Sequence, residues 1–432
     1  MKRKLPDKFV LAVLLMGQSL HAQTAPDLTQ ILERLARLEA ENDALRRQLS
    51  DLRRDLETRV QIQERRVDEQ AQTKVESAEK FPIRMRGMLV TNLFHNSPNA
   101  GGVDVPTSAS RFPGRTAAGI ALRQSVIGIE YRGPETFWGG KVDGSVFMDF
   151  FEGTTELNNL PPMRMRTGHI GLRWNSRSVT VALDKPLFSP RDPSSFSYIG
   201  VSPLTGSGNL WRWQQQVRFE QRLGTETTGL RAQAALVQTT EEVGTAAAPV
   251  VALERRRPGL QGRFAFFHRL DRDRSVEVAP SFHLSNTHAG SVSVPSRLFA
   301  VDWFANPFRR VQFSGLFFAG RNVDHFGATR QGFTVRGPGL IIPVHARGGW
   351  GQLAFPLTER VTLNLFGGMH DPRNRDLLPN GLRVNRTGAA NLMYRIAPNV
   401  FVTLEALQLR STFPDTGVRK NNRYDLSLVY LF

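Results

Sequence analysis

Residues 423–432, Arg-Tyr-Asp-Leu-Ser-Leu-Val-Tyr-Leu-Phe, end the chain with a two-residue alternation. One face of this stretch is apolar or aromatic and carries Tyr424, Leu426, Leu428, Tyr430 and Phe432. The opposite face begins with Arg423, Asp425 and Ser427. A strand that is apolar on one face and ends on an aromatic residue suits a membrane barrel, because lipid satisfies no backbone group and the strands must pair with one another. An edge strand of a soluble sheet is the alternative, and the rest of the chain decides between the two.

From Phe81 to Phe432 the sequence is rich in Gly, Phe and Arg and contains many runs with the same alternation. In one example Val361, Leu363 and Leu365 alternate with Thr362 and Asn364. Period-two patterns of this kind predict strands that are apolar on one face. We predict sixteen strands, near residues 83–95, 119–132, 140–152, 163–175, 178–184, 211–224, 227–239, 260–270, 275–288, 298–306, 311–320, 346–356, 361–371, 387–396, 399–411 and 423–432.

The connections between these strands alternate between short and long. Seven are compact, at residues 133–139, 176–177, 225–226, 271–274, 306–310, 356–360 and 397–398. Eight are longer, near residues 96–118, 153–162, 185–210, 240–259, 289–297, 321–345, 372–386 and 412–422. Outer-membrane barrels have short periplasmic turns and longer outer loops, and an even number of strands. The pattern therefore predicts an all-β, sixteen-stranded antiparallel transmembrane β-barrel over residues 81–432, in the outer membrane of a Gram-negative-type bacterium.

Residues 1–22 have the features of a secretory signal peptide. Lys2, Arg3, Lys4 and Lys8 are followed by the apolar run 9–16 and a plausible cleavage region, residues 17–22. A buried helix at the start of the domain is the alternative. The flanking charges favour export, so we expect a mature protein that lacks these residues.

Residues 27–75 predict a helical coiled coil. Apolar residues recur every seven positions over four heptads, and one polar residue interrupts the series: Leu28, Ile31, Leu35, Leu38, Asn42, Leu45, Leu49, Leu52 and Leu56. Residues 27–80 contain no Gly, and at 1.5 Å per residue the helix would be roughly 70 Å long. A solitary charged helix is the alternative. The seam leaves the number of helices in the coil open, and we expect it to lie in the periplasm.

The barrel carries most of the chain's positive charge. The formal net charge is +17, and residues 81–432 hold 41 basic and 25 acidic residues. An Arg facing the middle of the lipid bilayer costs about 2–4 kcal/mol, so these cations belong in the lumen, the loops or the rims. We expect the following residues to line the pore and attract anions: Arg84, Arg86, Arg173, Lys185, Arg191, Arg212, Arg218 and Arg222. The alternative is that arginines pair across strands with Glu130, Asp143, Asp149 and Glu220.

The third long loop, residues 185–210, is rich in Pro, Ser and Gly, but it also contains apolar residues such as Leu187, Phe188, Tyr198 and Ile199. A loop exposed to water needs no such residues, whereas a loop folded against the inner wall does. We therefore expect this loop to narrow the channel, with Lys185, Arg191 and Arg212 near its narrowest part. A contact between subunits is the competing interpretation.

The tryptophans predict interfacial girdles. Trp138 and Trp174 lie at periplasmic ends of the predicted strands, and Trp211, Trp213 and Trp350 lie near the outer ends.

The sequence lacks the motifs of several catalytic classes. No Gly-x-Ser-x-Gly, His-Glu-x-x-His or phosphate-binding loop occurs, there is no Cys, and nine His are scattered. The basic residues are spread over β-patterned sequence instead of a basic helix or aromatic-basic module. We therefore expect no enzyme activity, no catalytic residues, no cofactor, no metal and no nucleic-acid partner.

Over essentially its whole mature length, the chain resembles outer-membrane porins of the anion type that carry an N-terminal coiled coil. It is similar to DcaP-like porins and, more distantly, to phosphate-selective porins O and P. The resemblance lies in the exported Leu heptads, Pro-Leu-Phe-Ser-Pro at 186–190, Gly-Ser-Gly-Asn-Leu-Trp-Arg-Trp at 206–213 and the final Tyr-Leu-Phe. The dense Arg and Lys ladders of phosphate-selective members are absent from this sequence.

This resemblance implies a homotrimer of sixteen-stranded barrels that passes small anionic solutes such as dicarboxylates or phosphate. The C-terminal strand, with Tyr430 and Phe432, also resembles the signal that barrel assembly machinery reads in outer-membrane barrels. A tether or scaffold, for which the barrel is only a membrane anchor in the lipid, is the second function that we consider.

Overall fold

The computed structural model divides the chain into two units, Met1–Lys80 and Phe81–Phe432. It describes residues 82–151, 162–238, 257–289, 292–328, 331–337 and 339–432 of the second unit, and 33, 36, 37, 39–46, 48–53 and 56 of the first. The predicted signal peptide lies outside the described residues.

The described part of the first unit is helical throughout. Asn42, Leu45, Leu49, Leu52 and Leu56 of the predicted seam are exposed in the single chain. The other seam residues, Leu28, Ile31, Leu35 and Leu38, lie outside the described residues. The coiled coil itself therefore stays a prediction. In the part of the chain that the structure describes, no helix combines the length and the apolar character that a membrane span requires.

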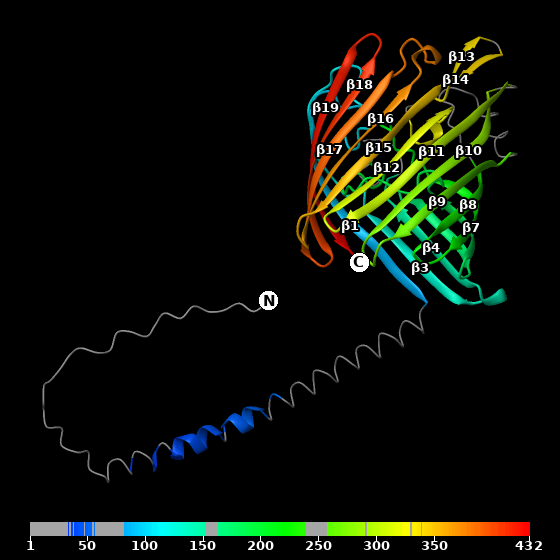
Figure 1. Ribbon diagram of the computed structural model, residues 1–432. Helices are drawn as coiled ribbons and strands as arrows, with labels where there is room; N and C mark the ends of the chain where they lie inside the picture. The colour runs from blue at the N-terminus through cyan, green and yellow to red at the C-terminus, as the bar shows by residue number, and fades with distance from the viewer. Residues whose placement is uncertain are drawn as a thin grey trace, which may run out of the picture. The chain divides into compact units, whose positions relative to one another are not determined.

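Antiparallel strands of the second unit close into a barrel (Figure 1). The strands are β1 (Ile83–Asn96), β2 (Ala117–Ala121), β3 (Val126–Glu135), β4 (Lys141–Asp149), β5 (Arg164–Arg173), β6 (Arg177–Asp184), β7 (Gln214–Gly224), β8 (Thr228–Gln238), β9 (Gly259–Arg269), β10 (Ser275–Ala289), β11 (Val292–Phe308), β12 (Val311–Arg321), β13 (Phe333–Gly337), β14 (Leu340–Pro343), β15 (His345–Pro356), β16 (Val361–Pro372), β17 (Val384–Ala397), β18 (Val400–Phe413) and β19 (Gly417–Leu431). Three single-turn 3-10 helices are η1 (Phe137–Gly139), η2 (Asp324–Phe326) and η3 (Asn374–Asp376).

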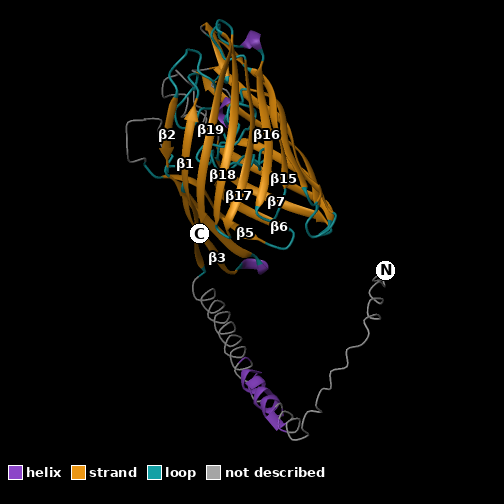
Figure 2. Ribbon diagram, turned by 90° about the vertical axis from the view of Figure 1, so that its left-hand side faces the viewer, coloured by secondary structure: helices purple, strands orange, loops and turns teal. Residues whose placement is uncertain are grey.

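The wall has sixteen strand positions. Strands β2 and β3 both pair with β1 and together occupy one position, while β13 and β14 form a separate hairpin at the loop end. Each wall strand otherwise pairs with its neighbours in sequence, and β1 closes the ring on β19 (Figure 2). The register of this closure runs from Met88 opposite Leu431 to Asn96 opposite Arg423. The predicted all-β barrel and its sixteen strands are confirmed.

Two of the eight predicted long loops are wrong. Residues 289–297 and 412–422 belong mainly to hairpins, because β10 and β11 extend to Ala289 and Val292, and β18 and β19 extend to Phe413 and Gly417. These extensions carry many polar residues on both faces. Beyond the apolar band water meets the outer face, so a strand there needs no apolar alternation. The β13–β14 hairpin lies inside the predicted loop 321–345 and was not predicted from the sequence.

The alternation of the last strand is confirmed. Tyr424, Leu426, Leu428 and Tyr430 point outward and are exposed, whereas Arg423, Asp425 and Ser427 are buried on the inner face. The backbone of Phe432 exchanges two hydrogen bonds with Gly87, at N···O distances of 3.0 and 3.1 Å. The last residue of the chain therefore takes part in closing the barrel.

Two tryptophans assigned to the outer girdle lie inside the barrel instead. Trp211 and Trp350 are 6% and 4% exposed. Trp213 stacks with the guanidinium groups of Arg164 and Arg166, which bind an inner-wall carboxylate. The inward loop supplies apolar partners there, so an inward Trp needs no contact with lipid. At the other end, Trp138 is 87% exposed in the β3–β4 turn.

Candidate functional site

The connection between β6 and β7, residues 185–213, folds into the lumen. The Leu187 amide donates to Gln261 on β9 (2.9 Å), and the Ser194 amide donates to Gln352 on β15 (2.6 Å). The hydroxyl of Ser197 lies 3.2 Å from that of Ser427 on β19. These partners belong to separate sectors of the wall, so the loop spans the lumen. We refer to it below as the inserted loop, and its inward fold agrees with the prediction.

Apolar contacts hold the inserted loop against the wall. Phe188, Leu204 and Leu210 are buried in one cluster with wall residues such as Leu316 and Phe318. Two smaller clusters join Ile199 to β1 and β19 and Tyr198 to β18. Full burial of a side chain of this size contributes about 1.5–3 kcal/mol, so these contacts fix the loop in place.

Arg191 of the inserted loop is neutralised by the wall. Its guanidinium binds Asp302 on β11 and Glu277 on β10, both at 2.5 Å. The buried Arg263 of β9 binds the same two carboxylates at 2.8 and 2.6 Å. Arg231 on β8 also contacts Glu277, at 3.7 Å. The predicted anion-attracting Arg191 therefore forms part of an ion-paired anchor.

Lys185 is also paired. Its ammonium group contacts Asp192 within the inserted loop, and the Asn209 amide donates to the same carboxylate at 3.0 Å. Burial tends to raise the pKa of Asp192, but attraction by Lys185 and hydrogen bonds from Lys185 and Asn209 outweigh it and hold the pKa below its usual range. The Lys185–Asp192 ion pair therefore lies at the start of the inserted loop, and Asn209 links it to the end of the loop.

Three of the predicted pore residues line one cavity on the inner wall. Arg173, Arg218 and Arg222 border a space of about 440 Å³, which β4 to β7 surround. Arg173 binds Asp143 at 2.7 Å, and Arg218 binds Asp184 at 3.2 Å. Arg222 is exposed and forms no ion pair with any residue that the structure describes. We call this cavity the vestibule, and it lies between the inserted loop and the short turns.

The remaining predicted residues lie apart from the vestibule. On β1, Arg86 binds Glu130 at 2.9 Å, while Arg84 is exposed and has no acidic partner among the described residues. Arg212 lies in the inserted loop, two residues before β7 begins, and donates its backbone N–H to the Phe326 carbonyl at 3.2 Å. Cross-strand pairing, the alternative weighed for these arginines, holds for Arg86 and Arg173.

The prediction missed several inward arginines. Arg164 binds Asp149 through two hydrogen bonds, at 2.7 and 3.1 Å, and donates to the Gly200 carbonyl at 2.6 Å. On β19, Arg423 binds Asp425 at 2.6 Å and lies over the ring of Phe94. Arg423 and Asp425 share one face of the last strand in the sequence, but only the fold brings Phe94 beside Arg423.

The described residues contain no group of three or more His, Cys, Asp or Glu that could hold a metal ion.

Several solved outer-membrane channels share this fold. The outer-membrane channel DcaP of Acinetobacter baumannii is 15% identical, with a TM-score of 0.65, over 81% of this chain and 97% of that one. The anion-selective porin from Comamonas acidovorans is 12% identical, with a TM-score of 0.55, over 81% and 99% of the two chains. The trimer form of OmpT from Vibrio cholerae is 11% identical, with a TM-score of 0.50, over 81% and 99%.

Neither a protein-family model nor a curated protein matches the chain by sequence. At these identities the structural likeness establishes the fold alone. The closed ring of sixteen strands, the inserted loop and these structural neighbours together show that the chain has the fold of a DcaP-like outer-membrane porin.

Proposed function

We propose that the chain is an outer-membrane porin, a passive diffusion channel that prefers small anionic solutes such as dicarboxylates or phosphate. The vestibule carries this proposal, because Arg222 extends into it without an acidic partner among the described residues, beside the paired Arg173 and Arg218. A low-dielectric wall focuses the field of such a cation into the lumen and raises the local concentration of anions. Exposed Arg84, which shares the inner face of β1 with Arg86, adds to this field.

The ion pairs support a ranking of the predicted residues. Lys185 and Arg191 are neutralised in the inserted loop, whereas Arg84 and Arg222 have no acidic partner among the described residues. We therefore assign anion attraction first to Arg84 and Arg222, then to Arg173, Arg218, Arg86 and Arg212. Weak sites spread along a wall suit passage better than one deep cluster, because the solute must also leave.

Reversal potentials across a salt gradient in planar bilayers test this proposal. We expect anion preference in the parent channel and a fall of the anion-to-cation permeability ratio by about two-fold in the double variant R84Q/R222Q. The matched control is R309Q/R310Q, which removes two exposed charges from the β11–β12 turn and leaves the inner wall intact. Cation preference in the parent, or an unchanged ratio in R84Q/R222Q, contradicts the assignment.

The second candidate function is an envelope tether whose barrel serves as an anchor in the lipid. The loop that spans the lumen is the observation that favours it. Single-channel conductance separates the two functions. A porin conducts in its native form, and removal of residues 193–207 increases its conductance, whereas a tether conducts only after this deletion.

We infer that the chain forms homotrimers in which the helices pair in the periplasm. The exposed leucines of the seam support this, since a coiled-coil partner would bury them. A trimer form is stated for the structurally similar OmpT. Crosslinking of the intact protein in membranes tests it, and species no larger than dimers would contradict it.

We infer that the barrel assembly machinery recognises the C-terminal strand through Tyr430 and Phe432, whose rings stack at 6.2 Å between centroids. Deletion of Phe432 removes this pair and both hydrogen bonds to Gly87, so we expect reduced levels of folded barrel in the outer membrane. Normal levels of the deletion variant in membrane fractions would rule this role out.

A further inference from the structure

Most of the described cations on the outer surface of the barrel gather on one side of the wall at the loop end. On β11, β12, β15, β17, β18 and β19, positions that face away from the lumen carry Arg297, Arg321, Arg347, Arg386, Arg410 and Lys420, which we call the rim belt. Their outward direction follows from the alternation, because their neighbours Leu298, Ala346 and Leu409 are buried on the inner face. The belt is separate from the vestibule and plays no part in the proposed conduction.

Like charges in the rim belt lie directly opposite one another. Arg297 pairs in register with Arg321 across β11 and β12. Arg386 pairs with Arg410, and Arg410 pairs with Lys420. Like charges directly opposite in a sheet destabilise it. An arrangement with three such pairs on one face therefore fits a surface that an anionic partner neutralises.

The belt contains few acidic residues. Arg347 binds Asp371 at 3.1 Å, and this is the single ion pair that any described side chain of the belt forms. The Nε of Arg386 instead contacts the Met369 sulfur, and that of Arg410 donates to Gln408. The guanidinium groups thus remain available to an outside partner.

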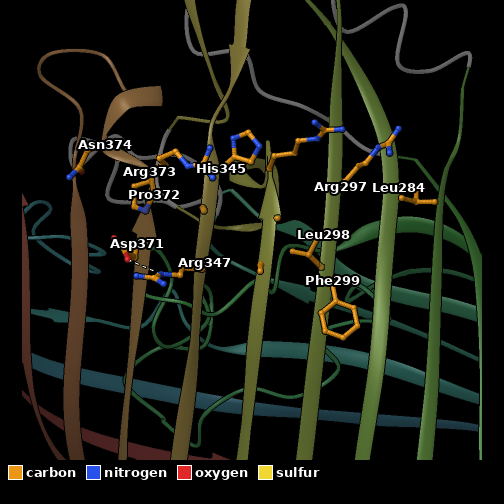
Figure 3. Close-up of a pocket in the computed structure, with 14 residues that line it drawn as sticks. Leu284, Arg297, Leu298, Phe299, His345, Arg347, Asp371, Pro372, Arg373 and Asn374 are labelled. Carbon is orange, nitrogen blue, oxygen red and sulfur yellow. Dashed lines mark hydrogen bonds and ion pairs between the residues drawn. The ribbon is translucent and has the colours of Figure 1, made fainter.

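The rim belt borders an apolar surface. A groove of about 820 Å³ on the outer face is lined by Arg297, Arg321, Arg347 and Arg373 and also by Phe299 (Figure 3). Phe299 is 53% exposed and lies on β11 two residues from Arg297, farther from the loop end. Phe317 on β12 and Leu365 on β16 are also exposed on this face. Cations therefore stand directly above side chains that suit acyl chains.

On the other side of Arg297, from β10 to β8, the outward positions in the same row are apolar. The residue in register with Arg297 on β10 is Leu284, which pairs in turn with Leu260 on β9. Leu260 pairs with Leu236 on β8. Cationic residues at the loop end are thus a property of one sector and not a general feature of the rim.

We propose that the rim belt binds phosphorylated lipid headgroups of the outer leaflet, with acyl chains against Phe299 and Phe317. Guanidinium groups bind phosphate oxygens in a two-pronged geometry, and several of them in a row match a headgroup with more than one phosphate. The apolar surface beside the belt distinguishes a lipid from a free anion. A second copy of this chain docked belt to belt would oppose like charges, because Asp371 is the acidic residue that binds a described belt side chain.

Binding of diphosphoryl lipid A to the purified full-length protein in detergent micelles, measured by native mass spectrometry, tests this proposal. We expect R297Q/R321Q and R386Q/R410Q each to weaken binding about tenfold, because each removes two charge-assisted contacts. R297K/R321K should retain more of the binding than the Gln pair. The matched control R309Q/R310Q, on the turn end of the β11–β12 hairpin, should bind like the parent. A difference in gel migration between unheated and heated samples confirms that each variant is folded.

Equal lipid binding in the parent and both belt variants overturns the proposal. Full competition by inorganic phosphate at equal concentration would identify the belt as a free-anion site and would also overturn it. So would a change in oligomeric state of the belt variants without lipid, which would make the belt a subunit interface. Channel selectivity is independent of these results, so failure here leaves the proposed porin function to its own test.

Discussion

Arg263 and Arg297 lie on the wall of the same barrel but in opposite environments. Arg263 is 2% exposed in the lumen and binds Asp302 and Glu277, whereas Arg297 is exposed on the outer face beside Arg321. The charge surplus of the barrel is therefore distributed unevenly. Inside, carboxylates neutralise most of the arginines that anchor the loop, and much of the unpaired charge lies at the outer rim and at the ends of the lumen.

This difference shows that the net charge of a porin-like barrel is a poor guide to the field in its channel. The cations near the inserted loop act as structural groups, because a buried charge requires a partner. The cations in contact with water or lipid headgroups need none. Three predictions test the distinction, from the largest expected effect to the smallest.

Arg263→Met should destabilise the barrel by about 3–5 kcal/mol, because it removes the buried partner of Asp302 and Glu277 and leaves Arg191, with Arg231 at 3.7 Å from Glu277, to compensate them. Urea unfolding in detergent, followed by tryptophan fluorescence, measures the free energy of unfolding. The exposed substitution Arg297→Met serves as the matched control. If Arg263→Met lowers the free energy of unfolding by less than 1 kcal/mol, the ion pairs of Arg263 contribute little to stability and the buried and exposed arginines do not differ in this respect.

Asp192→Asn should release the base of the inserted loop, at a cost of about 1–3 kcal/mol, because the amide cannot replace the charged partner of Lys185. The folded-state pKa of Asp192 lies below its ordinary value of about 3.9. The stabilisation is therefore complete above about pH 4 and is lost as the pH falls through the folded-state pKa.

Single-channel conductance against pH measures this release. Protonation of Asp192 should change the conductance of the parent channel when the pH falls below the ordinary pKa of an aspartate, about 3.9. The Asp192→Asn channel at neutral pH should resemble the parent in acid. A transition of the parent between pH 5 and 7 that persists in the variant would assign the pH response to another group.

The double substitution R297Q/R321Q should change stability in the absence of lipid by no more than about 0.5 kcal/mol, with a slight gain from the lost repulsion. The same unfolding measurement in lipid-free detergent provides the test. A loss above 2 kcal/mol would show that these rim arginines hold the wall together, and would remove the contrast with Arg263.

The sequence by itself determined the barrel and its strands. The outward positions of every strand must be apolar where lipid surrounds them, so the alternation in residues such as Leu426 and Leu428 reports the wall directly. The alternation failed to predict the strand residues within 289–297 and 412–422. There the strands leave the apolar band, and water permits polar residues on both faces. The apolar residues of the inserted loop, such as Phe188, were equally informative, because an exposed loop has no use for them.

Only the tertiary structure decided which cations are free. Arg173 and Arg222 look alike in their strands, but Asp143 of the neighbouring strand neutralises Arg173, and Arg222 has no acidic partner among the described residues. Arg191 meets its carboxylates 86 and 111 residues away in sequence. The rim belt likewise depends on the register that places Arg297, Arg321, Arg386 and Arg410 on one outer face. Strand alternation is a local property, whereas the pairing of charges depends on cross-strand register and on the path of the loop through the lumen.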